Sequence, residues 1–320
     1  MSKRFVAVVT DDRFGHLKEE RAVLEPLGVE LRTENCISSS DIAAKAKDAD
    51  ALLVNMAPLE RNAILSLKKC RVVSRYGVGL DNIDAAACLE AGIKLYNVPG
   101  YCDREVAEHA LSLLLALSRG IPERDRLIKS GMWNIASAQL SVAGSVIGIA
   151  GFGPTAKAFA EMAMALRPAK LLVWSPSLEQ KRLKEALALP AGIFGVDLAA
   201  VSFDELLAGA DFLSVHLKLV PESLGLFGQS AFAKIKKGAI LVNTARGALV
   251  DSVALAAALK EGKLAGAGLD VLDAEPPLPG HPLLSAPNVI LTDHSAYRSE
   301  RSLSELKRRA AENVARGLGL

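Results

Sequence analysis

Short apolar runs alternate with amphipathic stretches along most of the chain. Ten such runs, from RFVAVVT near the start to NVILTD near residue 290, are rich in valine, isoleucine and leucine. Stretches such as SDIAAKAKDA and SVALAAALKEGK lie between them and repeat their apolar residues at the spacing of one helical face. Strands that alternate with helices in this way predict parallel sheets with helices on both faces.

The predicted strands are too many for one ordinary open sheet, and 320 residues are enough for two hydrophobic cores. We therefore expect an α/β protein with two doubly wound parallel-sheet domains, Rossmann-like or flavodoxin-like, and a cleft between them. The segment VPGY at 98–101 interrupts the pattern and precedes a helix predicted over 103–119. A last helix is predicted over 299–315, and the pattern alone does not assign it to either domain.

Charge and cysteine content narrow the function classes. The 38 basic and 36 acidic residues leave a formal net charge of +2, which predicts no nucleic-acid partner and no membrane surface. The four cysteines form no C-x-x-C pair, so their spacing predicts free thiols and no metal site. No secretory signal pattern is present, and no apolar helix pattern reaches the ~20 residues of a membrane span. We expect a cytoplasmic protein.

The run SVIGIAG continues directly into a glycine-rich turn and a helical pattern. Gly151 permits a tight turn, Gly153 lets a pyrophosphate approach the backbone, and the small Ala156 lets helix and strand pack closely. Amides at the start of the helix then face the phosphates. This setting predicts dinucleotide binding, with a turn that merely packs as the alternative. The candidate cofactor residues here are Gly151, Gly153, Pro154 and Thr155.

The next predicted strand ends at Ser175, where an acidic residue that binds the adenosine ribose is expected. A carboxylate would repel a ribose phosphate, whereas a serine would not, and Lys181 or Arg182 would add attraction. In the alternative interpretation, these two basic residues are ordinary solvated positions at a helix start. The cofactor prediction therefore stays open between NAD and NADP, with Ser175 as a candidate contact.

Three polar residues of complementary chemistry follow three successive predicted strands. Arg246 follows AILVNTA, Glu275 lies in the loop after GAGLDV, and His294 follows NVILTD. Open α/β sheets bind their ligands at the carboxyl ends of the strands. A guanidinium there can hold a carboxylate through two parallel hydrogen bonds, and a histidine can take a proton from an alcohol and return it. A neighbouring glutamate favours the imidazolium and orients the ring.

With these motifs in place, the chain resembles the D-isomer-specific 2-hydroxyacid dehydrogenases, a family that includes D-3-phosphoglycerate dehydrogenase and glyoxylate/hydroxypyruvate reductases. Within that family it is similar to the branch that also contains the C-terminal-binding-protein co-repressors. The resemblance rests on RYGVGLDNID, NVPGYCDREVAEHALSLLLALSR, GFGPTA, VNTARGALVD and LDVLDAEPP, in the family's order.

The resemblance implies hydride transfer between NAD or NADP and a small D-2-hydroxy or 2-oxo acid. It implies that Arg246 binds the substrate, that His294 is the acid/base and that Glu275 pairs with His294. It further implies a discontinuous substrate-binding domain of residues 1–100 plus 296–320 and a Rossmann domain of residues 101–295. Two copies of the chain would pair through the helix at 103–119.

Further roles are implied for residues around the nicotinamide and the substrate. Asp270 would accept a hydrogen bond from the nicotinamide amide. The substrate carboxylate would bind backbone amides of the G-V-G turn, which by itself is an unobstructed backbone site for an anion. The residues that line the nicotinamide pocket would be Thr244 and Ala245, and those of the substrate turn would be Gly77, Val78 and Gly79.

Three positions depart from the family's pattern. Ser175 replaces the usual acid of NAD-using relatives. Asp293 precedes His294 where many members have proline, and Lys218 stands where relatives often carry proline near the cofactor. An alternative function from another class is an NAD(H)-sensing interaction protein of the co-repressor type with little turnover. The intact set of Arg246, Glu275 and His294 weighs against this alternative, since a sensor has no need of a proton donor.

Overall fold

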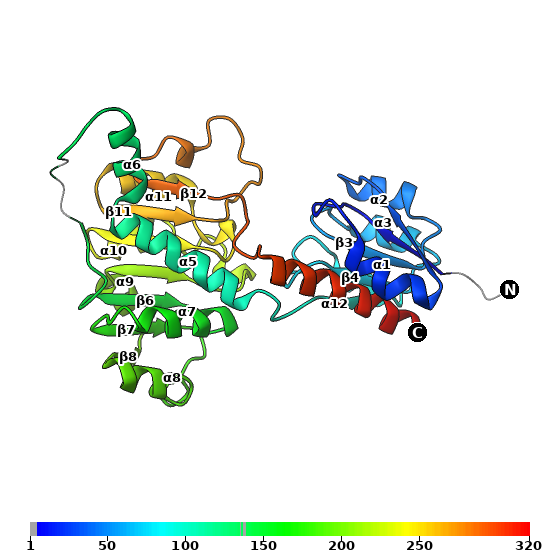
Figure 1. The fold of residues 1–320 in the computed structure, drawn as a ribbon, viewed down its shortest axis with the longest axis horizontal. Helices are drawn as coiled ribbons and strands as arrows, with labels where there is room; N and C mark the ends of the chain where they lie inside the picture. Colours follow the sequence, from blue (N-terminus) through cyan, green and yellow to red (C-terminus); the bar gives the residue numbers. More distant parts are fainter. Residues whose placement is uncertain (1–4, 135, 137–138) are drawn as a thin grey trace. The chain divides into compact units, whose positions relative to one another are not determined.

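The computed structural model describes residues 5–134, 136 and 139–320, and the chain divides into two compact units (Figure 1). Unit 1 comprises Met1–Tyr101 and Arg298–Leu320, and unit 2 comprises Cys102–Tyr297. Each unit is built around one parallel sheet whose strands are connected through helices. The predicted class, two doubly wound α/β domains, is confirmed.

Unit 1 contains a five-stranded sheet in the order β2-β1-β3-β4-β5, with every neighbouring pair parallel. Strands β3 and β4 are central and almost wholly buried, which explains their continuous apolar sequence. The strands are β1 (Phe5–Val9), β2 (Val29–Thr33), β3 (Ala51–Val54), β4 (Val72–Arg75) and β5 (Lys94–Tyr96).

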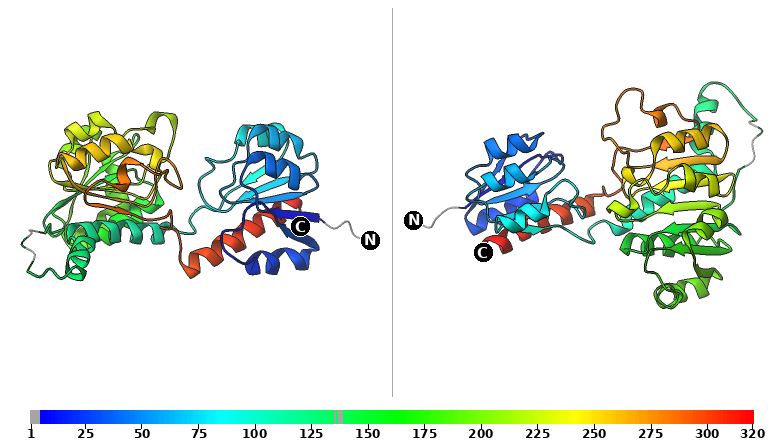
Figure 2. Two further views of the ribbon diagram at one scale, coloured as in Figure 1. Left: turned by 90° about the horizontal axis from the view of Figure 1, so that it is seen from above. Right: turned by 180° about the vertical axis from the view of Figure 1, so that it is seen from behind.

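Helices cover both faces of this sheet (Figure 2). One face packs against α1 (Lys18–Leu24) and the long last helix α12 (Glu300–Leu318), so the carboxyl-terminal helix belongs to unit 1. The other face packs against a buried cluster that includes Ile42, Ile64 and Cys88. Those residues come from α2 (Ser39–Lys45), α3 (Arg61–Ser66) and α4 (Ala85–Glu90).

Unit 2 contains a seven-stranded parallel sheet in the order β12-β11-β10-β9-β6-β7-β8. The order reverses between β6 and β9, which is the point at which open α/β sheets bind ligands at the carboxyl ends of their strands. The strands are β6 (Val146–Ala150), β7 (Lys170–Trp174), β8 (Asp197–Ala200), β9 (Phe212–Val215), β10 (Ala239–Asn243), β11 (Leu264–Leu269) and β12 (Val289–Leu291).

Two buried clusters, one on each face, form the core of unit 2. On one face, α5 lies so close to β11 that a Cβ added at Gly268 would meet the Leu113 side chain at 2.9 Å. The helices of this face are α5 (Asp103–Ser118), α7 (Pro154–Met164) and α8 (Gln180–Phe194). Those of the other face are α9 (Phe203–Gly209), α10 (Gln229–Lys234) and α11 (Ser252–Lys260).

The described residues form twelve strands, two more than the ten predicted runs. The additional strands, β2 and β8, are both at sheet edges and carry polar residues such as Arg32 and Asp197, which made them look like loops. The predicted helices at 103–119 and 299–315 correspond to α5 and α12. None of the helices in the described part of the chain is long and apolar enough to cross a membrane.

Candidate active site

The glycine-rich turn at 151–153 connects β6 directly to α7. Gly151 has a φ of 106°, and a Cβ there would lie 2.4 Å from the carbonyl oxygen of His216, so only glycine fits. By contrast, a Cβ added at Gly153 would meet nothing within 4 Å, so space is open above the start of α7. Ala156 is fully buried where the helix meets the sheet. This geometry is that of a phosphate-binding turn.

The residues around this turn fit a dinucleotide. First-turn amides of α7 have no acceptor within the helix and are available to a phosphate. The Thr155 hydroxyl is already engaged, donating to the Asp103 carboxylate at 3.1 Å. Thr244, after β10, is 8% exposed, and its hydroxyl has no hydrogen-bond partner among the described residues. A buried hydroxyl without a partner is costly, and a ligand at the strand end would satisfy it.

Ser175 directly follows β7 and is half-buried, and its carbonyl accepts from the Leu178 amide at 3.0 Å. The predicted basic residues Lys181 and Arg182 are exposed at the start of α8. Lys181 lies 3.9 Å from Glu185, one helical turn on. Strand β7 is therefore followed by a short turn that carries the Ser175 hydroxyl. The exposed positive charges of Lys181 and Arg182 come six and seven residues later in the sequence.

Arg246 follows β10 in a turn that is held by the side chain of Asn243. The Asn243 amide donates to the Arg246 carbonyl at 2.8 Å, and its oxygen accepts from the Ala245 amide at 3.0 Å. The Arg246 guanidinium in turn donates to the Ala245 carbonyl at 2.7 Å. Since Asn243 is fully buried, the turn is anchored in the core and the half-buried Arg246 side chain leaves from a fixed point.

Gly247 brings this turn against the loop that follows β11. A Cβ at Gly247 would lie 1.9 Å from the carbonyl carbon of Leu272, so the two backbones pack without a side chain between them. Beyond Leu272, Asp273 accepts hydrogen bonds from Ser252 and His281, each at 2.8 Å. The loop that carries Glu275 is therefore held against the segment that carries Arg246.

Glu275 and His294 form a hydrogen-bonded pair, with 2.7 Å between Oε2 and Nδ1. The other carboxylate oxygen accepts from the Leu272 amide at 3.0 Å. Burial raises the pKa of Glu275, but its hydrogen bonds to His294 and Leu272 and the positive charge of Arg246 outweigh burial, so the pKa lies below its ordinary value. The ionised Glu275 carboxylate holds Nδ1 of His294 and fixes the orientation of the ring. The structure thus brings Arg246, Glu275 and His294 to one edge of one sheet.

Asp270 holds the turn that carries His294. Its carboxylate accepts from the Thr292 hydroxyl at 2.6 Å and from the amides of Ser295 and Ala296 at 2.9 and 3.0 Å. Its carbonyl accepts from the His294 amide at 2.9 Å. His294 has a φ of 52°, an uncommon left-handed conformation that such contacts keep in place. The resemblance implies only a nicotinamide contact for Asp270, and the sequence gives no signal of this second role.

In unit 1, the turn at 77–79 follows β4. Gly77 has a φ of 140°, and a Cβ there would collide with the Arg75 guanidinium. The Gly77 and Val78 carbonyls accept from the Val98 amide at 2.8 Å and the Asn97 side chain at 2.7 Å. Within the part of the chain that the structure describes, neither the Val78 nor the Gly79 amide donates a hydrogen bond, so both are available to a ligand.

Lys218 and Asp293, which depart from the family's pattern, lie outside the Arg246–Glu275–His294 set, and both are exposed. Another histidine, His216, directly follows β9 and lies against the glycine-rich turn. Its ring packs on Phe159, and its Nε2 lies 2.8 Å from the Ser214 hydroxyl. Burial lowers the pKa of His216 to about 4, so the ring is neutral near pH 7.

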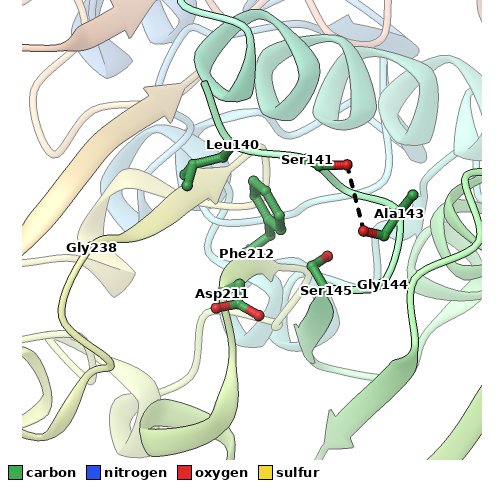
Figure 3. Close-up of a pocket in the computed structure, with 8 residues that line it drawn as sticks. All are labelled: Leu140, Ser141, Ala143, Gly144, Ser145, Asp211, Phe212 and Gly238. Atoms are coloured by element: carbon green, nitrogen blue, oxygen red, sulfur yellow. Dashed lines mark hydrogen bonds between the residues drawn. The ribbon is translucent and has the colours of Figure 1, made fainter. Parts of the chain in front are cut away.

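A cavity of about 240 Å³ lies at the amino-terminal ends of the unit 2 strands (Figure 3). Ser145, Asp211 and Gly238 line it and directly precede β6, β9 and β10. The cavity is therefore at the amino ends of the strands, whereas the candidate site is at the carboxyl ends. It contains none of the predicted site residues.

Comparisons with known proteins place the chain in a family. The sequence profile of the D-isomer specific 2-hydroxyacid dehydrogenase family, NAD binding domain, matches residues 111–296. A D-3-phosphoglycerate dehydrogenase of Archaeoglobus fulgidus is 35% identical over 296 residues, which are 91% of this chain and 54% of that protein. A glyoxylate reductase of Korarchaeum cryptofilum is 35% identical over 283 residues, covering 87% of this chain and 82% of that protein.

The chain thus spans about half the length of the D-3-phosphoglycerate dehydrogenases it matches, and most of the glyoxylate reductase. A crystal structure of a glyoxylate reductase from Paecilomyes thermophila is similar over 97% of this chain and 94% of that one, with a TM-score of 0.84 and 28% identity. A D-lactate dehydrogenase from Aquifex aeolicus, solved with NAD and lactic acid, shares the fold with a TM-score of 0.86 over 98% and 96% at 24% identity. The chain belongs to the D-isomer specific 2-hydroxyacid dehydrogenase family.

Proposed function

We propose that this protein is an NAD(P)-dependent oxidoreductase that interconverts a D-2-hydroxy acid and a 2-oxo acid. The observation that carries the proposal is the Glu275–His294 pair, 2.7 Å apart, on the strand ends next to Arg246. A carboxylate-supported imidazole is suited to proton transfer, and a guanidinium is suited to binding a carboxylate. Family membership and the phosphate-binding turn at 151–153 supply the cofactor half of the proposal.

His294 would transfer the proton. When 2-oxo acid is reduced, the charged imidazolium donates its proton from Nε2 to the substrate oxygen, because Nδ1 is held by Glu275. In the reverse direction the neutral ring takes the proton from the alcohol. A nicotinamide bound at the carboxyl ends of the strands supplies or accepts the hydride. Asp270 keeps the histidine at its position through the amides of Ser295 and Ala296.

Arg246 and, in unit 1, the turn at 77–79 would bind the substrate. The guanidinium would bind the carboxylate and polarise the carbonyl oxygen, since its planar fork offers parallel donors. The amides of Val78 and Gly79 would donate to the same class of anion. The names of the relatives suggest two substrate types for trial, a three-carbon phosphorylated acid and glyoxylate.

The residues proposed to contact the cofactor also lie at the carboxyl ends of strands in the unit 2 sheet, after β6, β7 and β10. Gly151, Gly153, Pro154 and Thr155 would surround the pyrophosphate, and Thr244 and Ala245 would line the nicotinamide pocket. Ser175 would face the adenosine ribose without the negative charge that rejects a 2′-phosphate. We therefore propose that both NADH and NADPH bind, and that the two exposed positive charges at the start of α8 favour the phosphorylated form.

We further propose that the protein is a homodimer. The helix α6 (Ile121–Lys129) has no buried residue, although its sequence is amphipathic. Large apolar side chains on and after it are exposed: Ile121, Ile128, Met132 and Trp133. A cluster of this kind next to α5 is typical of a surface that another chain covers. Light scattering of the parent and of Ile128→Glu tests the proposal: the parent should have the mass of a dimer and the variant that of a monomer.

The function is tested by a screen of 2-oxo acids with both reduced cofactors. Glyoxylate, hydroxypyruvate and phosphohydroxypyruvate are added to the purified protein with NADH or NADPH, and the loss of reduced cofactor is followed by absorbance. Turnover that yields the D-hydroxy acid supports the proposal. Tight cofactor binding without turnover on any acid would instead support the NAD(H)-sensing alternative.

A further inference from the structure

A buried network of charged side chains lies under one face of the unit 1 sheet. Lys307 of α12 has a side chain that is only 2% exposed, and its ammonium lies 2.6 Å from the Glu19 carboxylate and 3.6 Å from that of Glu20, both on α1. It also donates to the Nδ1 atom and the carbonyl of His16, at 2.8 and 2.6 Å. Glu20 is fully buried. Charged side chains are rarely fully buried unless they are paired, because removing them from water is costly.

Tyr76 connects this network to the turn at 77–79. Its hydroxyl donates to the Glu20 carboxylate at 2.8 Å, and its ring packs edge-on against Phe14. Its amide donates to the Val54 carbonyl at 2.8 Å and fixes the backbone to β3. Burial and the adjacent Glu20 raise the pKa of Tyr76 well above its ordinary value, so the phenol remains a neutral donor. Both ends of the residue that precedes Gly77 are therefore anchored.

We propose that Tyr76 is a positioning residue, and that its hydrogen bond to Glu20, supported by Lys307, holds the 77–79 turn in the conformation that binds the substrate carboxylate. This inference rests on the proposed function, since it takes the turn as the substrate site of unit 1. In this network Lys307 pairs most closely with Glu19, while Glu20, whose pKa is raised by burial, accepts from the tyrosine.

The contacts on the two sides of the 77–79 turn support this assignment. The Gly77 and Val78 carbonyls are held by the Val98 amide and the Asn97 side chain, on the side of the turn toward β5. Tyr76 supplies the anchor toward the helices. Without the phenolic hydrogen bond, the backbone bonds of Tyr76 and Gly77 remain, but the side chain that precedes Gly77 is no longer fixed to Glu20, and glycine itself does little to restrict the backbone. The amides of the turn would then sample orientations that do not converge on an anion.

The test compares Tyr76→Phe with the matched control Tyr96→Phe, which removes a hydroxyl from the adjacent strand β5. Because a buried hydrogen bond is lost and the Glu20 carboxyl is left without its donor, we expect KM for the 2-oxo acid to rise about tenfold in Tyr76→Phe. The kcat should change less than about twofold, since uniform binding is lost. Cofactor affinity should be unchanged, and Tyr96→Phe should resemble the parent in all three values. A merely structural role would lower the Tm without this split between KM and kcat.

Hydrogen exchange provides a second measurement that needs no turnover. The amides of Tyr76, Gly77 and Val98 donate backbone hydrogen bonds to Val54, Arg75 and Gly77 respectively, and they should exchange faster in Tyr76→Phe than in the parent. Parent-like exchange together with a KM within about twofold of the parent would overturn the proposal, as would a lower Tm with unchanged KM. A parent that turns over no 2-oxo acid would refute the proposed function, and the exchange comparison would still decide whether Tyr76 holds the turn.

Discussion

Two strands of the unit 2 sheet, β9 and β12, are followed within three residues by histidines with contrasting surroundings. After β12, His294 is about one-third exposed and hydrogen-bonds an ionised carboxylate, Glu275. At the end of β9, His216 packs on Phe159, contacts the neutral hydroxyl of Ser214, and has a pKa lowered to about 4. The same side chain thus has an ionised carboxylate as its partner in one case and a desolvated, uncharged environment in the other.

The difference shows that position at a strand end does not make a histidine an acid/base group. After β12 a carboxylate partner orients the ring, whereas after β9 burial lowers the pKa of the ring and keeps it neutral. The backbone of His216 instead packs against the glycine-rich turn, because its carbonyl oxygen would lie 2.4 Å from any Cβ at Gly151. Variants at the two histidines separate these two roles.

The largest effect is expected for His294→Ala. Loss of the proton donor should lower kcat/KM for 2-oxo acid reduction by roughly 10²–10⁴. His216→Gln is the control within the same sheet, because glutamine can keep the hydrogen bond to Ser214, and its kcat/KM should stay near the parent value. Equal losses in the two variants, measured under the same conditions, would remove the distinction between the two strand ends.

A smaller loss is expected for Arg246→Lys. Lysine keeps the charge but not the planar fork, so kcat/KM should fall about 10- to 100-fold, mainly through KM. Steady-state kinetics with an unsubstituted 2-oxo acid checks this, and Lys260→Arg on the exposed end of α11 is a matched surface exchange. If Arg246→Lys kept the parent KM, the guanidinium would have no part in binding the carboxylate.

Glu275→Gln tests the partner that separates the two histidines. Without the carboxylate, Nδ1 of His294 loses the partner that orients the ring, so kcat/KM for reduction should fall about tenfold. The measurement is kcat/KM for reduction in the variant and in the parent under the same conditions. An unchanged kcat/KM would show that Glu275 has no part in positioning His294.

The smallest effect concerns stability and His216. Its ordinary pKa is 6.5 and its folded pKa is about 4, so as pH falls between these values the unfolded chain takes up a proton that the folded chain does not. The free energy of unfolding should therefore decrease over this range, by about 1–2 kcal/mol for a half-buried ring. Urea unfolding should show a smaller decrease for His216→Gln than for the parent. Parallel curves would mean that the ring is not buried when neutral.

Much of the fold follows from hydrophobic periodicity. Central strands such as β3 and β10 are continuous apolar runs because both faces are covered, so they are readily predicted. The edge strands β2 and β8 are missed because their polar residues face solvent. The pattern also cannot assign α12 to a unit, since its packing on α1 and β4 depends on contacts with residues far away in the sequence.

The candidate site divides in the same way. Arg246, Glu275 and His294 are predictable because each follows a strand, and parallel strands bring such positions to one edge. The contacts that hold them in place are not predictable: Asp270 bonds residues 22 to 26 positions away, and the Asn243 side chain holds the turn that carries Arg246. Pattern identifies which side chains reach the site, and only the structure shows what keeps them there.

The central claim is that His294 moves the proton in both directions, and opposed pH profiles test it most directly. The profile of kcat/KM is measured for 2-oxo acid reduction and for D-2-hydroxy acid oxidation, in the parent and in His294→Gln. We predict that reduction falls and oxidation rises with increasing pH around one shared midpoint, and that both dependences vanish in the variant. Profiles that run in the same direction, or that persist in His294→Gln, would contradict the account.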